Sequence, residues 1–174
     1  ATRVQKLSLP PKVDKNEDAT SFSFACLVEN VLTEKECREL LEQFNAKAFR
    51  PCLLNKSHGN QMLDPAVRDT FRVMVDSPNL AAWIFHVIEP HLPKQLEDGS
   101  SLVGLNPFLR CLCYTPGQKF ESHMDNKLTI ADGSFSRVSA FIYLNTVPKS
   151  YGGATTFCPV CTHWPCWHSD QDKV

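Results

Sequence analysis

Residues 110–125 read RCLCYTPGQKFESHMD. Residues 105–114, which overlap the start of this stretch, are rich in apolar and Cys residues without helical spacing. This composition predicts a strand. A turn is predicted at residues 115–117, and extended backbone after it. In extended backbone the side chains of residues two apart point to the same face. His123 and Asp125 can therefore converge on one cation.

An imidazole and a carboxylate side by side match the chemistry of an open metal site. A facial triad of two His and one carboxylate leaves three coordination positions free, as an oxygenase requires. A structural zinc site, with four protein ligands, would leave no coordination position free. The His-x-Asp tripeptide alone is common, and for the bare tripeptide a surface His near a turn Asp is the better explanation. The surrounding residues therefore carry the metal interpretation.

Helix-start signals occur three times in the first half of the chain, and they are Thr33 with Glu36, Asp64 with Pro65, and Ser77 with Pro78. Each is followed by apolar residues at helical spacing, which for the second predicted helix are Val67, Phe71, Met74 and Val75. Pro51 and Pro90 are expected to end the first and third helices. Arg68 and Arg72 are assigned to a solvated face of the second helix, paired with nearby acidic residues.

Strand patterns dominate the second half. Residues 138–144 alternate in the manner of a buried strand, and residues 154–157 predict a further short one. Residues 21–28 predict an early strand, and residues 1–20 a mobile arm. Helices first and strands second indicate an α+β fold with helices packed on a sheet or partial barrel.

Composition narrows the function classes. The 174 residues suit one domain, and 18 Lys plus Arg against 19 Asp plus Glu leave a net charge of -1. We expect no nucleic-acid partner, because no basic face is indicated, and no membrane span, because no apolar run approaches ~20 residues. No secretory signal is visible, so the eight cysteines are expected to be free thiols in a reducing compartment, the cytoplasm or alternatively the nucleus.

Four blocks of the chain, in order, resemble the prolyl 4-hydroxylase-like branch of the 2-oxoglutarate/Fe(II) oxygenases. Residues 110–125 resemble that family's block of Tyr, Gly, aromatic and HxD. Residues 143–145 (YLN) and 152–157 (GGATTF) resemble its YLN and GGxTxF blocks. Residues 29–37 resemble the helix start that commonly precedes the catalytic core. The resemblance covers about residues 24–157.

The resemblance implies a double-stranded β-helix (jelly-roll) core with Fe(II) and 2-oxoglutarate as cofactors and ascorbate as a candidate reductant. By matched position, His123 and Asp125 are the first two iron ligands, and they are the expected catalytic residues. Tyr114 and Tyr143 match tyrosines that contact 2-oxoglutarate, and Thr155 lies in a strand that lines the same pocket. The alternative for both tyrosines is a core-filling strand residue with a satisfied hydroxyl.

The chain departs from the family after Phe157. The family carries a second iron His there, followed by a Lys or Arg that grips the far carboxylate of 2-oxoglutarate, and residues 158–174 match neither. We therefore expect a core that lacks its last strands, with unpaired edges open to self-association. The expected organisation is an arm (1–20), an oxygenase-like domain (21–157) and a tail (158–174).

The tail holds metal-type side chains, which are Cys158, Cys161, His163, Cys166 and His168. A CxxC spacing suits one corner of a zinc site. A well-separated second pair is missing, however, so an unstructured tail is the favoured interpretation.

The expected activity is that of a dioxygenase that hydroxylates a C–H bond, with release of succinate and CO2. The substrate is a peptidyl residue, with proline as one option, or a small molecule, because fold does not fix function. The alternative is a catalytically inactive, truncated homologue that acts as a binding or structural module.

Overall fold

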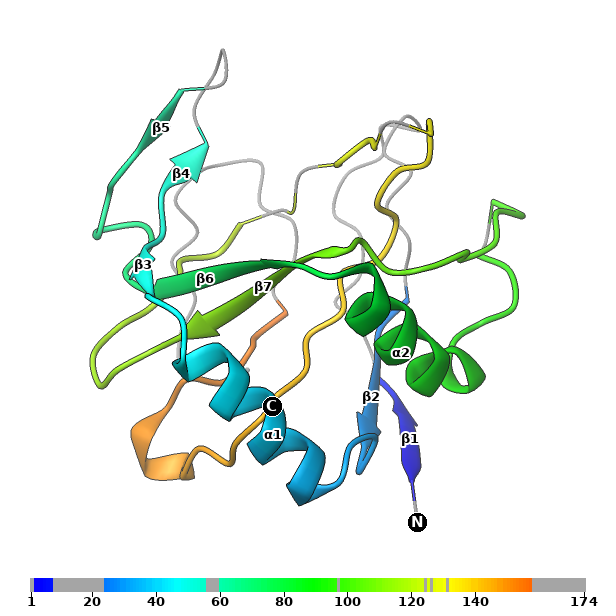
Figure 1. Ribbon diagram of the computed structural model, residues 1–174, viewed down its shortest axis with the longest axis horizontal. Helices are drawn as coiled ribbons and strands as arrows, with labels where there is room; N and C mark the ends of the chain where they lie inside the picture. The colour runs from blue at the N-terminus through cyan, green and yellow to red at the C-terminus, as the bar shows by residue number, and fades with distance from the viewer. Residues whose placement is uncertain are drawn as a thin grey trace.

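The structure is a computed structural model, which describes residues 2–7, 24–55, 60–96, 98–123, 125, 127–130 and 132–157. Two α-helices and three small antiparallel sheets make up the regular structure of these residues (Figure 1). The predicted α+β class is thereby confirmed. Within these ranges, none of the helices has the length and apolar character needed to cross a membrane.

The largest sheet has three strands in the order β3-β6-β7. Its central strand is β6 (Phe71–Asp76), which pairs on one side with β3 (Arg50–Pro51) and on the other with β7 (Phe108–Cys113). In the β6–β7 register, Val73 lies opposite Cys111. Strand β7 confirms the strand that was predicted over residues 105–114. A separate two-stranded sheet joins β4 (Leu54–Asn55) to β5 (Gln61–Met62).

The third sheet lies near the N-terminus, where β1 (Arg3–Lys6) pairs with β2 (Cys26–Glu29). Strand β2 overlaps the strand predicted over residues 21–28. Strand β1 falls inside the stretch predicted as a mobile arm. The ladder to β2 supplies hydrogen bonds that local sequence patterns cannot reveal. Residues 8–20 and the tail lie outside the described residues.

Both α-helices begin where the capping signals predicted. Helix α1 (Glu34–Asn45) starts with a capping box, in which the Thr33 hydroxyl accepts from the Glu36 amide and the Glu36 carboxylate accepts from the Thr33 amide. Helix α2 (Pro78–Ile88) is capped by the Ser77 hydroxyl and has proline in its first turn. Two short 3-10 helices are η2 (Glu89–His91) and η3 (Lys149–Tyr151).

The core lies between the helices and one face of the large sheet. Leu40 and Phe44 of α1 are buried against Val73 of β6. Partly buried apolar side chains complete this cluster, and they are Leu32, Phe49, Val75, Leu80, Trp83, Cys111 and Leu144. In Figure 1, α1 lies below β6 and β7, and α2 follows at the end of β6. The opposite face of β6 and β7 is therefore not covered by these helices.

The second predicted helix is wrong, because its residues form β6 instead. The start signal at Asp64 gives only a turn, in which the Val67 and Arg68 amides donate to the Asp64 carbonyl. The residues after it alternate between buried and exposed positions and include two valines, a pattern that suits a strand. Pairing with β7 fixes that choice, since β7 supplies the ladder that a strand requires.

The predicted strands at residues 138–144 and 154–157 are also corrected. Neither segment belongs to a strand in the structure. A strand needs a hydrogen-bonded neighbour, and no part of the described chain pairs with either segment. Leu144 nevertheless packs against the core, so the first segment keeps part of its expected burial.

Candidate functional site

The chain reaches the candidate site through the turn that follows β7. The Gln118 amide donates to the Thr115 carbonyl, and Gly117 takes a φ of 86°, which favours glycine. The next residues lie along the segment before β6. Phe120 forms an isolated bridge with Arg68, and the Glu121 amide donates to a backbone carbonyl of the same segment. The backbone that carries the HxD motif is thus anchored to a distant part of the sequence.

His123 and Asp125 converge as their spacing predicted. The His123 Nε2 atom lies 3.6 Å from the Asp125 Oδ1 atom. The other ring nitrogen, Nδ1, lies 2.8 Å from the Glu121 carbonyl oxygen. A carbonyl only accepts, so Nδ1 carries a proton and donates to it, and Nε2 is the ring nitrogen on the Asp125 side. This is the arrangement of a metal-ligating His oriented by a backbone carbonyl.

Asp125 is oriented by a residue that the sequence did not single out. The Ser139 hydroxyl donates to the Asp125 Oδ2 atom, which leaves Oδ1 facing His123. The side chains of His123 and Asp125 are 36% and 56% exposed, so a cation or a small molecule can reach both from solvent. Ser139 follows Val138 in the alternating segment, and that position is the only sequence signal it offered.

An aromatic stack connects His123 to an arginine. The rings of Phe120 and His123 are stacked, with centroids 3.7 Å apart. The guanidinium carbon of Arg68 lies 4.2 Å from the Phe120 centroid. Arg68 was predicted to lie on a solvated helix face, which is wrong because no helix forms there. Its link to Phe120 depends on two segments far apart in sequence, so no local signal could have found it.

The residues expected to contact 2-oxoglutarate are partly brought together. The hydroxyls of Tyr143 and Thr155 share a hydrogen bond. Burial raises the pKa of Tyr114, and the positive charge of Arg68 and the Thr70 hydroxyl oppose that rise, while the nearby Tyr143 adds to it. Tyr114 therefore keeps its proton at neutral pH and can act as a hydrogen-bond donor. Tyr143 is 60% exposed, so its hydroxyl does not serve core packing.

The donor set fits two neighbouring positions of an iron site. An imidazole nitrogen and a carboxylate oxygen are ligands that Fe(II) accepts in a facial triad. Within the described ranges, no group of three or more His, Cys, Asp or Glu side chains is placed to hold a metal ion. The third ligand is therefore not identified. His163, His168 and the rest of the candidate zinc tail lie outside the described residues.

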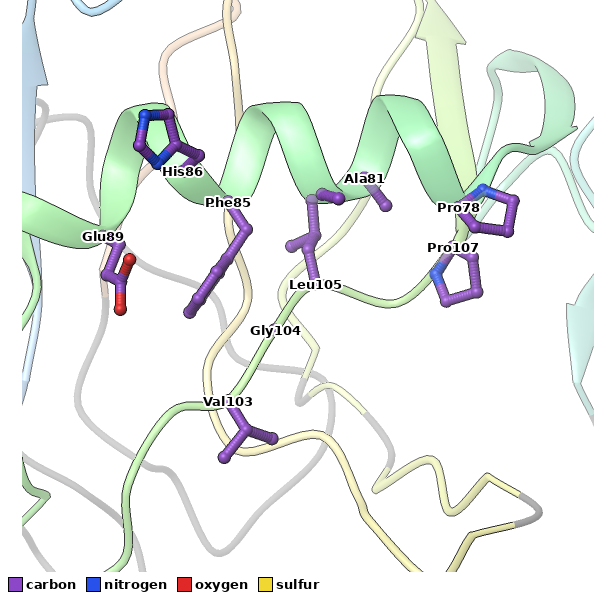
Figure 2. Close-up of a pocket in the computed structure, with 10 residues that line it drawn as sticks. Pro78, Ala81, Phe85, His86, Glu89, Val103, Gly104, Leu105 and Pro107 are labelled. Atoms are coloured by element: carbon purple, nitrogen blue, oxygen red, sulfur yellow. The ribbon is translucent and has the colours of Figure 1, made fainter.

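The surface hollows of the described chain lie elsewhere. One, of about 280 Å³, runs between α2 and residues 103–107, and its lining includes Phe85, Val103 and Leu105 (Figure 2). Another, of about 350 Å³, lies between the two α-helices. No residue of the predicted metal or 2-oxoglutarate site lines either hollow.

Comparison of the chain with protein-family models, with curated proteins and with solved structures found no match. Membership of the oxygenase family therefore stays a prediction that rests on the four sequence blocks.

Proposed function

We propose that this chain acts as an Fe(II)- and 2-oxoglutarate-dependent dioxygenase. The reaction is hydroxylation of a C–H bond in a peptidyl or small-molecule substrate, with release of succinate and CO2. One observation carries the proposal: the His123 Nε2 and Asp125 Oδ1 atoms lie side by side while Nδ1 and Oδ2 are each held by another protein group. A cation between them would meet two ligands that are already oriented.

His123 and Asp125 would hold the iron at adjacent positions, with the third protein ligand still to be identified. Bound iron supplies the activation of dioxygen that is coupled to decarboxylation of 2-oxoglutarate. The protein's own part is to orient the imidazole, with Nε2 toward Asp125, through the Glu121 carbonyl, and to keep one carboxylate oxygen available through Ser139. A jelly-roll core around this site is part of the proposal, since the described strands show only small antiparallel sheets.

Tyr114, Tyr143 and Thr155 would bind the co-substrate. A tyrosine hydroxyl carries its proton at neutral pH, since its ordinary pKa is about 10, and burial raises the pKa of Tyr114 further. A phenol that donates to a carboxylate makes a charge-assisted hydrogen bond, about twice as strong as a neutral one. The hydroxyls of Tyr143 and Thr155 share a hydrogen bond. These two hydroxyls would bind the co-substrate together with the Tyr114 hydroxyl.

The setting proposed for this activity is a reducing compartment, the cytoplasm or alternatively the nucleus. The five described cysteines are free thiols in the structure, which is compatible with it. The proposed partners are the substrate and, through sheet edges, a second copy of the chain. Strands β3 and β7 have no outer neighbour among the strands that the structure describes.

The second candidate function is a catalytically inactive binding module. The observation that favours it is the absence of a third metal ligand from the described residues. Turnover separates the two functions, because only the dioxygenase would convert 2-oxoglutarate into succinate. The purified chain would be incubated with Fe(II), ascorbate, dioxygen and 2-oxoglutarate, and succinate would be measured.

We expect succinate from the unmodified chain and none above background from Asp125→Ala. Glu39→Ala is the matched control, because it removes a carboxylate from the exposed surface of α1. Succinate formation at the unmodified rate by Asp125→Ala, or none from any chain, would contradict the dioxygenase and favour the binding module.

A further inference from the structure

Three arginines from three strands lie on the face of the large sheet that the helices leave uncovered. Val73 of β6 and Cys111 of β7 lie opposite each other, and both belong to the core. Successive side chains of a strand point to opposite faces, so Arg72 and Arg110 lie on the other face. Arg50 of β3 is the direct partner of Arg72 and shares that face. We call these three residues the sheet arginines.

The strand register makes the sheet arginines close neighbours. Side chains directly opposite each other in an antiparallel pair have Cβ atoms roughly 4.5–5.5 Å apart, and diagonal neighbours lie roughly 7–8 Å apart. Arg50 and Arg72 are such an opposite pair. Arg72 and Arg110 are diagonal neighbours, because Arg72 lies opposite Leu112, which is on the same face of β7 as Arg110. The three guanidinium groups therefore form one continuous patch across β3, β6 and β7.

The positive charge of this patch is not neutralised within the described ranges of the chain. None of the sheet arginines forms an ion pair with an Asp or Glu there. Like charges directly opposite each other destabilise a sheet, so Arg50 and Arg72 face each other at a cost in free energy. Asp76 lies on the same face, at the end of β6, and forms no ion pair with them. Three positive charges against this one negative charge leave the face positive.

Exposed apolar side chains lie among these charges. Met74 is the partner of Arg110, and Phe108 is the partner of Asp76, so both share the arginine face. Their side chains are 45% and 53% exposed. Apolar surface bordered by charge is typical of a protein interaction site, and arginine and aromatic residues are enriched there. A nucleic-acid backbone, in contrast, favours a continuous basic surface, which Asp76 interrupts.

We propose that the uncovered face of the β3–β6–β7 sheet docks an acidic segment of a partner protein. The carboxylates of that segment would pair with the sheet arginines, and its apolar side chains would pack on Met74 and Phe108. Guanidinium suits this role because its planar donors bind a carboxylate through two parallel hydrogen bonds. The inference is independent of the proposed dioxygenase function, since it uses neither the HxD residues nor the residues predicted to bind 2-oxoglutarate.

The test uses a fluorescently labelled peptide with the repeat Glu-Ser-Leu-Ser, in which Glu and Leu alternate along one side of an extended chain. Its binding to the full chain is measured by fluorescence anisotropy at low salt, without added metal. The variants are Arg110→Gln and the double variant Arg50→Gln/Arg110→Gln, because both positions are exposed and their replacement spares the fold. Arg38→Gln, at an exposed position on α1, is the matched control.

We expect the peptide to bind the unmodified chain and Arg38→Gln equally, and Arg110→Gln about two- to fivefold more weakly, the loss of one exposed ion pair. The double variant should bind more weakly still, and added salt should reduce the difference. Undiminished binding to the double variant, or no binding to any chain, would overturn the proposal. Equal binding of the same peptide with Gln in place of Glu would also overturn it, because the contact would then be apolar only. Tighter binding of single-stranded RNA, or displacement of the peptide by inorganic phosphate at matched concentration, would instead indicate a nucleic-acid or general anion surface.

Discussion

At the scale of single residues, the two oxygens of Asp125 have different surroundings. Oδ2 accepts from the Ser139 hydroxyl, and Oδ1 lies 3.6 Å from the His123 Nε2 atom. A carboxylate held in this way offers one oxygen to a cation without losing further side-chain freedom. Ser139 therefore acts as a positioning residue, because it touches the proposed ligand and not the proposed ion.

Ser139→Ala should lower the affinity for a divalent ion by roughly 10- to 100-fold, the usual cost of removing a group that orients a metal ligand. The measurement is anaerobic calorimetric titration with Fe(II). Ser150→Ala is the control, since Ser150 is an exposed residue of η3. Equal affinity in Ser139→Ala and the unmodified chain would show that the hydroxyl does not orient the ligand.

The sequence located His123 and Asp125 but missed Arg68 and Ser139. Residues two apart share a face in extended backbone whatever the fold around them, so the pair was predictable. Arg68 reaches the site through an aromatic ring more than fifty positions downstream, and Ser139 through a hydroxyl bond between two loops. Contacts of this kind depend on the tertiary arrangement, which no local pattern encodes.

At the scale of elements, local signals predicted the helices correctly because capping is a local interaction. The capping box of α1 and the serine cap of α2 lie where the sequence indicated. Strand β6 was misread because its apolar residues also fit helical spacing, and its partner β7 follows more than thirty residues later. The Thr70 hydroxyl also depends on a segment distant in sequence, because it donates to the Cys113 carbonyl of β7.

Thr33→Ala should destabilise the protein by about 1 kcal/mol, because it removes the acceptor for the Glu36 amide. Urea unfolding followed by circular dichroism measures the free energy. The control is Thr146→Ala, at an exposed position outside regular structure. An equal loss in both variants would mean that the cap contributes nothing specific.

The capping box also predicts a dependence of stability on pH. Hydrogen bonds from the Thr33 amide and hydroxyl lower the pKa of Glu36. A carboxyl with a lowered pKa in the folded state stabilises the protein above its unfolded pKa, and this contribution is lost as the pH falls through the folded value. Glu36→Gln should therefore lose less stability than the unmodified chain between neutral and acidic pH. Parallel pH profiles would contradict this role, with Glu42→Gln as the control.

At the scale of the whole molecule, one core joins α1 to one face of the large sheet, and Arg72 and Arg110 lie on the other face. Leu40, Phe44 and Val73 are the buried centre of that core. Its helix–sheet packing holds the segment before β6, and through the Arg68–Phe120 bridge that segment holds the HxD backbone. Core packing and the candidate site are thus mechanically connected through the backbone.

Phe44→Ala should cost about 3–5 kcal/mol of unfolding free energy, because it leaves a cavity beneath the central strand. Phe108→Ala is the matched control, since the Phe108 side chain is 53% exposed on the uncovered face of the sheet. Urea unfolding measures both. A similar cost for the two substitutions would contradict the assignment of the core to the α1 side.

The central claim is that His123 and Asp125 hold Fe(II) beside 2-oxoglutarate. Its most direct test is the visible absorption spectrum of the purified chain with Fe(II) and 2-oxoglutarate under anaerobic conditions, where chelation produces a metal-to-ligand charge-transfer band. We predict a band for the unmodified chain and for Glu39→Ala, and its loss in Asp125→Ala. No band in the unmodified chain, or an undiminished band in Asp125→Ala, would contradict the claim.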